Sequence, residues 1–224
     1  MSELVMIEPR RCEIAEGVPA LEIWLGGTPR GLVVLLTDAT SPEGEVVEAM
    51  NNLAAEGFES LALRAGDGVE TLVEPRARVR GWRAEQIGVV GIGHGGTIAL
   101  SMARQREVGA VVSISPALDQ EAVDEVVASP RLCTPLLVML GAQDPAVPAA
   151  APARLRAALD AGSDVFSRVV EYPGVGADFY RRSEDGISFA ASYDSWQRTV
   201  EWLLARVASR LTPLAEAWRA LHPV

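Results

Sequence analysis

The chain has 224 residues, 49% of them hydrophobic, so it can bury most of its apolar surface in one core, and a single domain over residues 1–224 is expected. The formal net charge of -10 argues against nucleic acids and anionic membranes as partners. All 20 basic residues are Arg, and without Lys the chain has neither a Walker A loop nor a Schiff-base lysine.

Apolar runs alternate with amphipathic segments, a pattern typical of strands that alternate with helices. Because the runs are continuous and rich in β-branched residues, they indicate strands buried on both faces. We therefore expect an α/β fold, with a mostly parallel sheet of about seven or eight strands and helices on both faces. In chain order, strands are expected at 12–15, 21–25, 31–37, 59–64, 87–92, 109–115, 135–141 and 167–173, and helices at 45–55, 70–83, 97–106, 121–128, 149–161 and 192–210.

The C-terminal segment 211–224 is expected to form an amphipathic tail helix. Its apolar residues, Leu211, Leu214, Trp218 and Leu221, recur at helical spacing. This stripe either packs on the same domain or serves dimerisation, so the sequence predicts a monomer or a homodimer.

Cysteine and histidine limit the chemistry further. Cys12 and Cys133 lie far apart in apolar contexts, which indicates reduced thiols and a cytoplasmic protein. His94 and His222 are the only two histidines, too few for a zinc-type cluster, so neither a metal nor another cofactor is expected. The N-terminal residues form no continuous apolar run, so neither a signal peptide nor a membrane span is expected.

The segment VVGIGHGG, residues 89–96, stands between a predicted strand and a predicted helix and fits two signatures. The spacing Gly91-x-Gly93-x-x-Gly96 matches the dinucleotide-binding fingerprint, which also requires an acidic residue about 20 positions on, at the end of the next strand. That position holds no acid, and the first one after the strand is Asp119. The same segment matches the Gly-x-Ser-x-Gly nucleophile elbow, with Gly93 at its tip. Since the elbow is followed in sequence by an acid on a later loop, Asp144 in GAQDPAVP favours this second interpretation.

Three segments in order, VVGIGHGG, GAQDPAVP and EYPGVGADFY, resemble the Gly-x-Cys-x-Gly-Gly elbow, the acid loop and the histidine loop of the dienelactone hydrolase family. The resemblance extends over residues 31–204 and implies an α/β-hydrolase fold. The segment 66–86 is shorter than the family's usual lid and connecting region.

The resemblance also shows where this chain departs from the family. It places Gly93 at the nucleophile position and Ala177 at the histidine position, and of the triad it leaves only Asp144. At the two positions where the family has a His-Glu pair, the resemblance places Thr37 and Asp38 of this chain. Because glycine has no heteroatom and alanine cannot accept a proton, ordinary nucleophilic hydrolysis is not expected.

The polar groups that remain near this site define the candidate residues. Asp144, His94 and Asp38 are the candidates for a catalytic role. The resemblance makes the His94 backbone N–H an oxyanion-hole donor, while its side chain either packs beneath the turn or lines a pocket. Because Asp144 has no imidazole beside it, we expect its carboxyl group either to pair with an Arg, to accept hydrogen bonds from backbone N–H groups, or to be protonated. The candidate ligand pocket comprises Thr37, Asp38, Ala39, Gly93, His94, Asp144, Asp178 and Tyr180, of which Asp178 and Tyr180 are equally interpretable as hydrogen-bonded loop residues.

Three functional hypotheses follow. The first is a protein that binds a small carbonyl-bearing hydrophobic molecule and promotes a non-hydrolytic step such as cyclisation, isomerisation or proton transfer. The second is a non-catalytic scaffold or interaction protein whose pocket has closed. The third is residual, water-mediated ester or lactone hydrolysis assisted by Asp144 or His94. An open apolar pocket over Gly93 would distinguish the first hypothesis from the second.

Overall fold

The computed structural model describes residues 6–15, 17–66, 68, 80–181, 185–211, 214, 217–218 and 221–222. The helix predicted over 70–83 lies outside these residues except for its last four positions, which are not helical and lead into a short 3₁₀ turn, η1 (Ala84–Gln86). The tail helix predicted over 211–224 also lies largely outside them. Its described Leu214, Trp218 and Leu221 side chains are exposed, so these three do not pack on the domain.

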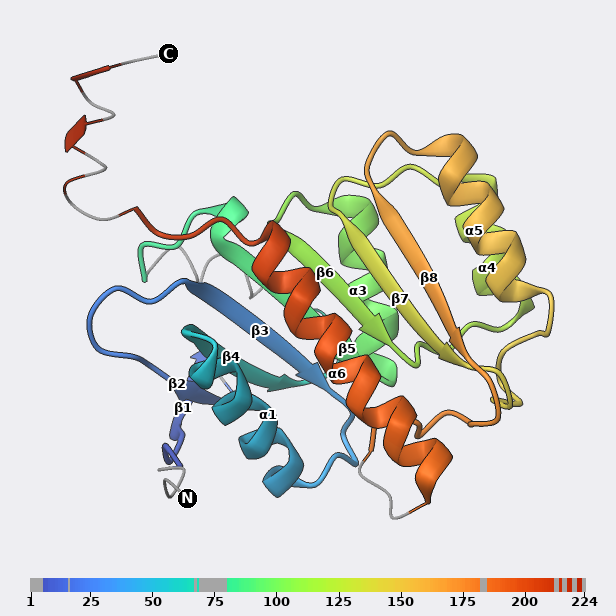
Figure 1. The fold of residues 1–224 in the computed structure, drawn as a ribbon, viewed down its shortest axis with the longest axis horizontal. Helices are drawn as coiled ribbons and strands as arrows, with labels where there is room; N and C mark the ends of the chain where they lie inside the picture. Colours follow the sequence, from blue (N-terminus) through green and yellow to red (C-terminus); the bar gives the residue numbers. More distant parts are fainter. Residues whose placement is uncertain are drawn as a thin grey trace.

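A single sheet of eight strands organises the chain, in the order β1-β2-β4-β3-β5-β6-β7-β8 (Figure 1). Strands β3 to β8 run parallel to one another, while β2 pairs antiparallel with both β1 and β4. The predicted fold class, an α/β protein with a mostly parallel sheet, is therefore confirmed. The strands are β1 (Arg10–Ala15), β2 (Val18–Ile23), β3 (Gly31–Thr37), β4 (Phe58–Arg64), β5 (Ile87–Ile92), β6 (Ala110–Ile114), β7 (Leu136–Gly141) and β8 (Ser167–Tyr172).

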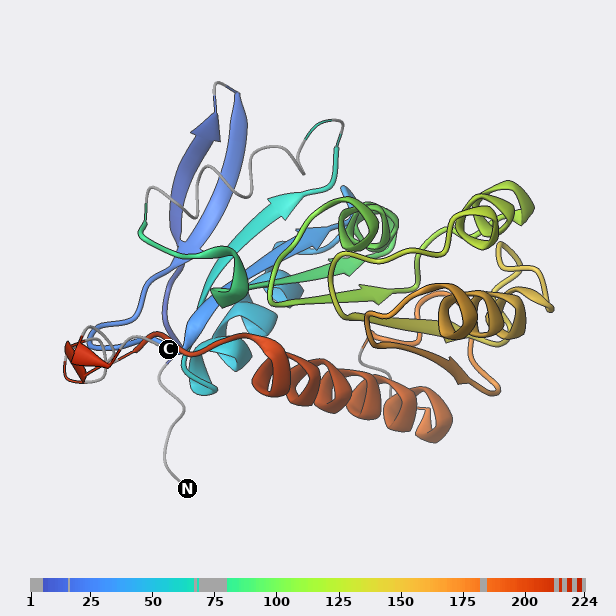
Figure 2. The same ribbon diagram turned by 90° about the horizontal axis from the view of Figure 1, so that it is seen from above.

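Helices cover both faces of this sheet, as predicted. Side chains of β3 alternate between two hydrophobic clusters: Leu32, Val34 and Leu36 join one, and Val33 and Leu35 join the other. Helices α3 (His94–Gln105), α4 (Gln120–Ala128) and α5 (Ala151–Gly162) contribute to the first cluster. Helices α1 (Glu43–Ala55) and α6 (Gly186–Arg206) contribute to the second, and Figure 2 shows them on the same side of the sheet. No helix in the described part of the chain is long and apolar enough to span a bilayer.

Element boundaries agree best where apolar runs are continuous. The predicted strands 31–37 and 87–92 match β3 and β5 at both ends, and α1 ends before Gly57, whose φ of 84° only glycine adopts readily. Helix α6 instead begins at Gly186, well before the predicted residue 192. The cause is a cap, since the Asp185 carboxylate accepts a hydrogen bond from the Ser188 backbone N–H at 3.0 Å.

Glycines at the junction of β5 and α3 let the helix rest directly on the sheet backbone. A Cβ atom on Gly91 would stand 2.0 Å from the carbonyl oxygen of Gly95, and one on Gly95 would stand 2.0 Å from the carbonyl oxygen of Leu36. Both distances are far inside van der Waals contact, so no larger residue fits at either position. Gly91 and Gly95 of the elbow segment are therefore required by packing.

Candidate functional site

The loops that carry the predicted site residues all leave the same edge of the sheet. Because β3, β5, β7 and β8 are parallel, their carboxyl ends lie along one edge. Asp38 follows β3, Gly93 follows β5, Asp144 comes after β7, and Ala177 comes after β8. Ligands of open α/β sheets bind outside this edge, so the topology assembles a candidate site here.

Gly93 forms the sharp turn between β5 and α3. Its φ of 60° and ψ of -123° lie in a region that side-chain-bearing residues rarely adopt. The turn is held on both sides, because the Gly93 N–H donates to the Ile114 carbonyl at 2.9 Å and the Gly93 carbonyl accepts from the Gly96 N–H at 2.9 Å. The strained strand-to-helix geometry of a nucleophile elbow is thus present at Gly93.

A carboxylate stands against this turn. A Cβ atom on Gly93 would lie 3.2 Å from Oδ2 of Asp38, and the same oxygen accepts the His94 backbone N–H at 3.5 Å. The other oxygen accepts from the Thr40 backbone N–H at 3.0 Å and from the Thr40 hydroxyl at 2.9 Å. These Thr40 hydrogen bonds, with a smaller contribution from the His94 N–H, hold the pKa of Asp38 below its ordinary value. Asp38 is therefore an anion that already uses the amide predicted to bind an oxyanion.

Asp144 and Ala177 lie on neighbouring loops. Asp144 is buried, and its carboxylate accepts a hydrogen bond from the Ala146 backbone N–H at 2.9 Å. A backbone donor is one of the three interactions expected for this carboxyl group. The acid loop and the histidine loop are joined where the Gln143 N–H donates to the Val175 carbonyl at 2.8 Å. Ala177 itself is exposed. The contact between these loops supports the predicted correspondence, while the approach of Ala177 to Gly93 stays a prediction.

Three other predicted residues are exposed. The His94 side chain is solvent-exposed, so the expectation that it packs beneath the turn is wrong: the space there is taken by the direct contact of Gly91 and Gly95. Ala39 is exposed, and its carbonyl accepts a hydrogen bond from the Arg64 guanidinium. Asp178 is exposed and forms an ion pair with Arg181 at 3.1 Å.

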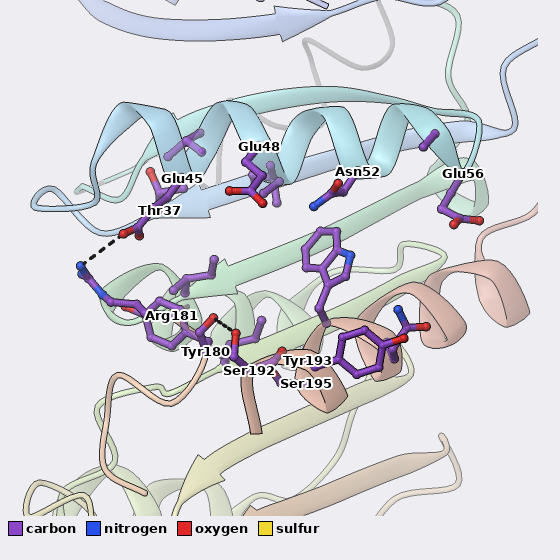
Figure 3. A pocket seen from close by; sticks show the side chains of 18 of the residues that line it. Thr37, Glu45, Glu48, Asn52, Glu56, Tyr180, Arg181, Ser192, Tyr193 and Ser195 are labelled. Atoms are coloured by element: carbon purple, nitrogen blue, oxygen red, sulfur yellow. Dashed lines mark hydrogen bonds and ion pairs between the residues drawn. The ribbon is translucent and has the colours of Figure 1, made fainter. Parts of the chain in front are cut away.

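A groove of about 580 Å³ lies between α1 and α6, beside the elbow (Figure 3). Its apolar floor includes Leu35, Ile92 and Ile114, near the carboxyl ends of three strands. Of the residues predicted to line a pocket, Thr37 and Tyr180 line this groove. Asp38, Ala39, Gly93, His94, Asp144 and Asp178 are not among its lining residues.

Tyr180 and Arg181 form the polar end of the groove nearest Thr37 (Figure 3). Burial raises the pKa of Tyr180; Arg181 opposes this effect, whereas the charges of Asp178 and Asp38 add to it. The phenol therefore stays protonated at neutral pH and can donate a hydrogen bond. This end of the groove lies close to the elbow, because Thr37, which lines it, directly precedes Asp38.

The other groove residues were missed by sequence reasoning. Most of them come from α1 and α6. Ser192, Ser195 and Thr199 place hydroxyls on the inner side of α6, with Ser195 and Thr199 fully buried.

Among the described residues, no group of three or more His, Cys, Asp or Glu side chains could hold a metal ion.

Comparisons with known proteins agree with this geometry. The sequence model of the dienelactone hydrolase family matches residues 31–206, and no curated protein sequence matches the chain. A dienelactone hydrolase-type protein of Klebsiella pneumoniae has a TM-score of 0.72 at 22% identity, over 88% of this chain and 98% of its own.

Two further solved structures have the same fold. Thermogutta terrifontis esterase 2, phosphoramylated by tabun, has a TM-score of 0.71 at 14% identity, over 90% of this chain and 96% of its own. A dienelactone hydrolase-like promiscuous phosphotriesterase from metagenomic libraries has a TM-score of 0.63 at 17% identity, over 87% and 98% of the two chains. At these identities the likeness establishes the fold, which is that of the α/β-hydrolases.

Proposed function

This chain belongs to the dienelactone hydrolase family, and from that premise we propose that it binds a small, carbonyl-bearing hydrophobic molecule and does not hydrolyse it through a nucleophile. The observation that carries the proposal is the apolar groove of about 580 Å³, which reaches Ile92 beside the elbow; the expected pocket was to lie over Gly93, and Gly93 is not among the lining residues of this groove. Pockets for small organic molecules typically measure roughly 300 to 1,000 Å³ and combine apolar walls with a few polar groups.

The residues at the elbow support the absence of hydrolysis. Gly93 and Ala177 leave the nucleophile and histidine positions without reactive atoms, and loss of a triad lowers turnover by on the order of 10⁶ in a well-studied serine hydrolase. The Asp38 carboxylate adds a second obstacle. It accepts the His94 N–H, so an oxyanion at that position would meet an existing negative charge.

Tyr180 is the group best suited to orient a carbonyl. Its phenol lines the groove and remains a hydrogen-bond donor, whereas the His94 amide is already engaged. Proton transfer would also require a base, and the strongly hydrogen-bonded Asp38 is a weak one because its pKa is lowered. Binding is therefore the primary function that we propose, with a non-hydrolytic proton transfer as a secondary possibility.

The test fills the groove. Ala49 lines it from α1, so Ala49→Trp should occupy its volume, whereas Ala157→Trp on the exposed side of α5 is a matched control. We expect 4-phenylbutan-2-one to shift amide resonances around the groove in the wild type and the control, and to lose binding at least about tenfold in Ala49→Trp. Binding that persists in a folded Ala49→Trp variant, or no binding to the wild type, would refute the proposal.

A second candidate function, a non-catalytic interaction protein, is favoured by the exposed Leu214, Trp218 and Leu221 of the tail. Light scattering after size exclusion would test its simplest form, a homodimer. A dimer that dissociates in Trp218→Asp would support this candidate, and a wild-type monomer at high concentration would count against it.

A further inference from the structure

The end of the groove farthest from Thr37 has a chemistry of its own. Asn52 and Glu56 at the C-terminal end of α1 line the groove, as do Tyr193, Trp196 and Gln197 farther along α6, and Figure 3 shows Glu56 at the opposite end from Thr37 and Glu45. These segments of the two helices contribute a carboxylate, two amides and two aromatic rings to the groove. For brevity we call these five residues the distal end.

The distal end carries a carboxylate that has no ion-pair partner within the described part of the groove. Among the described residues, Glu56 forms no ion pair. Arg181 is the one described guanidinium that lines the groove, and it lies at the other end, 3.1 Å from Asp178 and 3.9 Å from Glu45. The negative potential at the distal end is therefore not balanced by the groove itself.

Helix α1 adds to this potential. Glu56 is its C-cap residue, and the last turn contains no basic side chain. The carbonyl groups at a helix C-terminus carry about half a negative charge, which favours a cation nearby. Basic side chains often lie near the last turn of a helix, and α1 has none there, so a bound cation would interact favourably with these carbonyl groups.

Aromatic rings supply the second attraction for a cation. Trp196 is half-buried in the groove wall and Tyr193 is exposed at its mouth. An ammonium group over an indole or phenol face gains about 0.5–1 kcal/mol at exposed sites. Because the ring faces are apolar as well, the same residues accept the hydrocarbon that carries the ammonium.

We propose that the groove selects organic cations: its ligand has an apolar body that lies on the floor formed by Leu35, Ile92 and Ile114, and an ammonium group that stands between Glu56 and Trp196. This inference rests on the proposed function, since the groove must first bind an apolar body. It adds the charge of the ligand and the place where that charge is bound.

The test uses three probes with one hydrocarbon frame: 4-phenylbutylammonium, 4-phenylbutan-1-ol and 4-phenylbutanoate. Each is titrated into the ¹⁵N-labelled full chain at low salt, and the dissociation constant is taken from amide and indole shifts. We expect the ammonium to bind about threefold to fivefold more tightly than the alcohol, and the carboxylate to bind most weakly. Added salt should shrink the preference.

The variant Glu56→Gln locates the effect. It should reduce the preference for the ammonium over the alcohol while leaving the alcohol's own affinity unchanged, since the carboxylate charge is removed and the attraction of the aromatic rings remains. Glu121→Gln, an exposed carboxylate on α4 across the sheet, should change neither.

The outcomes separate the two proposals. Equal affinities of ammonium and alcohol for the wild type, or a preference that is undiminished in Glu56→Gln, would overturn the cation inference and leave the binding function intact. Failure of all three probes to bind would overturn both.

Discussion

Replacing Gly93 by alanine tests whether the elbow retains its strain after losing a reactive side chain. At φ 60° and ψ -123° a side-chain-bearing residue costs about 1–3 kcal/mol, and alanine returns roughly 0.4–1 kcal/mol by restricting the unfolded chain. The new Cβ would also stand 3.2 Å from Oδ2 of Asp38, which must move slightly. We expect Gly93→Ala to lower the free energy of unfolding by about 1–2 kcal/mol, and Tm by about 3–8 °C.

Thermal and urea unfolding, followed by circular dichroism, would measure this change. Gly44→Ala is the matched control, because nothing lies within 4 Å of its Cβ position in the first turn of α1, and it should be neutral or stabilising. The double variant with Asp38→Ala separates the two contributions: it should recover the part due to the carboxylate contact and retain the part due to backbone strain. If Gly93→Ala is as stable as the wild type, the reasoning about a strained elbow is wrong.

Three further predictions concern activity, pH and packing. The purified protein should not turn over p-nitrophenyl acetate above a heat-denatured control; saturable turnover by homogeneous protein would contradict the proposed function. The pKa of Asp38 is lowered in the folded state, so the ionised carboxylate stabilises the protein above its unfolded pKa of about 4, and this stabilisation is lost as the pH falls through the folded pKa. Asp38→Asn should therefore destabilise the protein more at pH 7 than at about pH 2.5, as measured by thermal unfolding. Tyr172→Phe should lower the free energy of unfolding in urea by about 1 kcal/mol, because it removes a 2.8 Å hydrogen bond to Asp194. Tyr193 lies on the same helix as Asp194 and is exposed, so Tyr193→Phe should change the free energy of unfolding little. Equal effects of the two variants would argue against the hydrogen bond.

The fold was predictable because its signals are local. Continuous apolar runs such as 31–37 and 87–92 can hardly be anything but strands buried on both faces, and their alternation with helices dictates a parallel sheet. The start of α6 was missed because a single capping bond of Asp185 extends that helix by six residues beyond its clear hydrophobic pattern. A cap is one interaction, so it leaves little trace in the periodicity of a sequence.

The candidate site was predictable only in part, because it depends on distances between elements. The order of strands places Asp38, Gly93 and Asp144 at one edge, and a motif can reveal that. The contact of Asp38 with the elbow joins residues 56 positions apart, and it depends on loop conformation. The groove depends on how far α1 stands from α6, which follows from side-chain volumes across the whole face. No local pattern encodes that separation.

The direct seating of α3 on the strands has a consequence for how hydrolytic activity can be lost. Gly91 and Gly95 are demanded by backbone contacts, whereas a Cβ atom at position 93 would meet only the side chain of Asp38 within 4 Å. A single codon can therefore remove or restore the side chain at the tip of the turn at a local cost in strain, while the seating of the helix on the sheet stays the same. A glycine-rich signature of this kind reports how a helix meets a sheet. In genome annotation it should be read as a statement about architecture, and the residue at the tip of the turn should be checked before any activity is assigned.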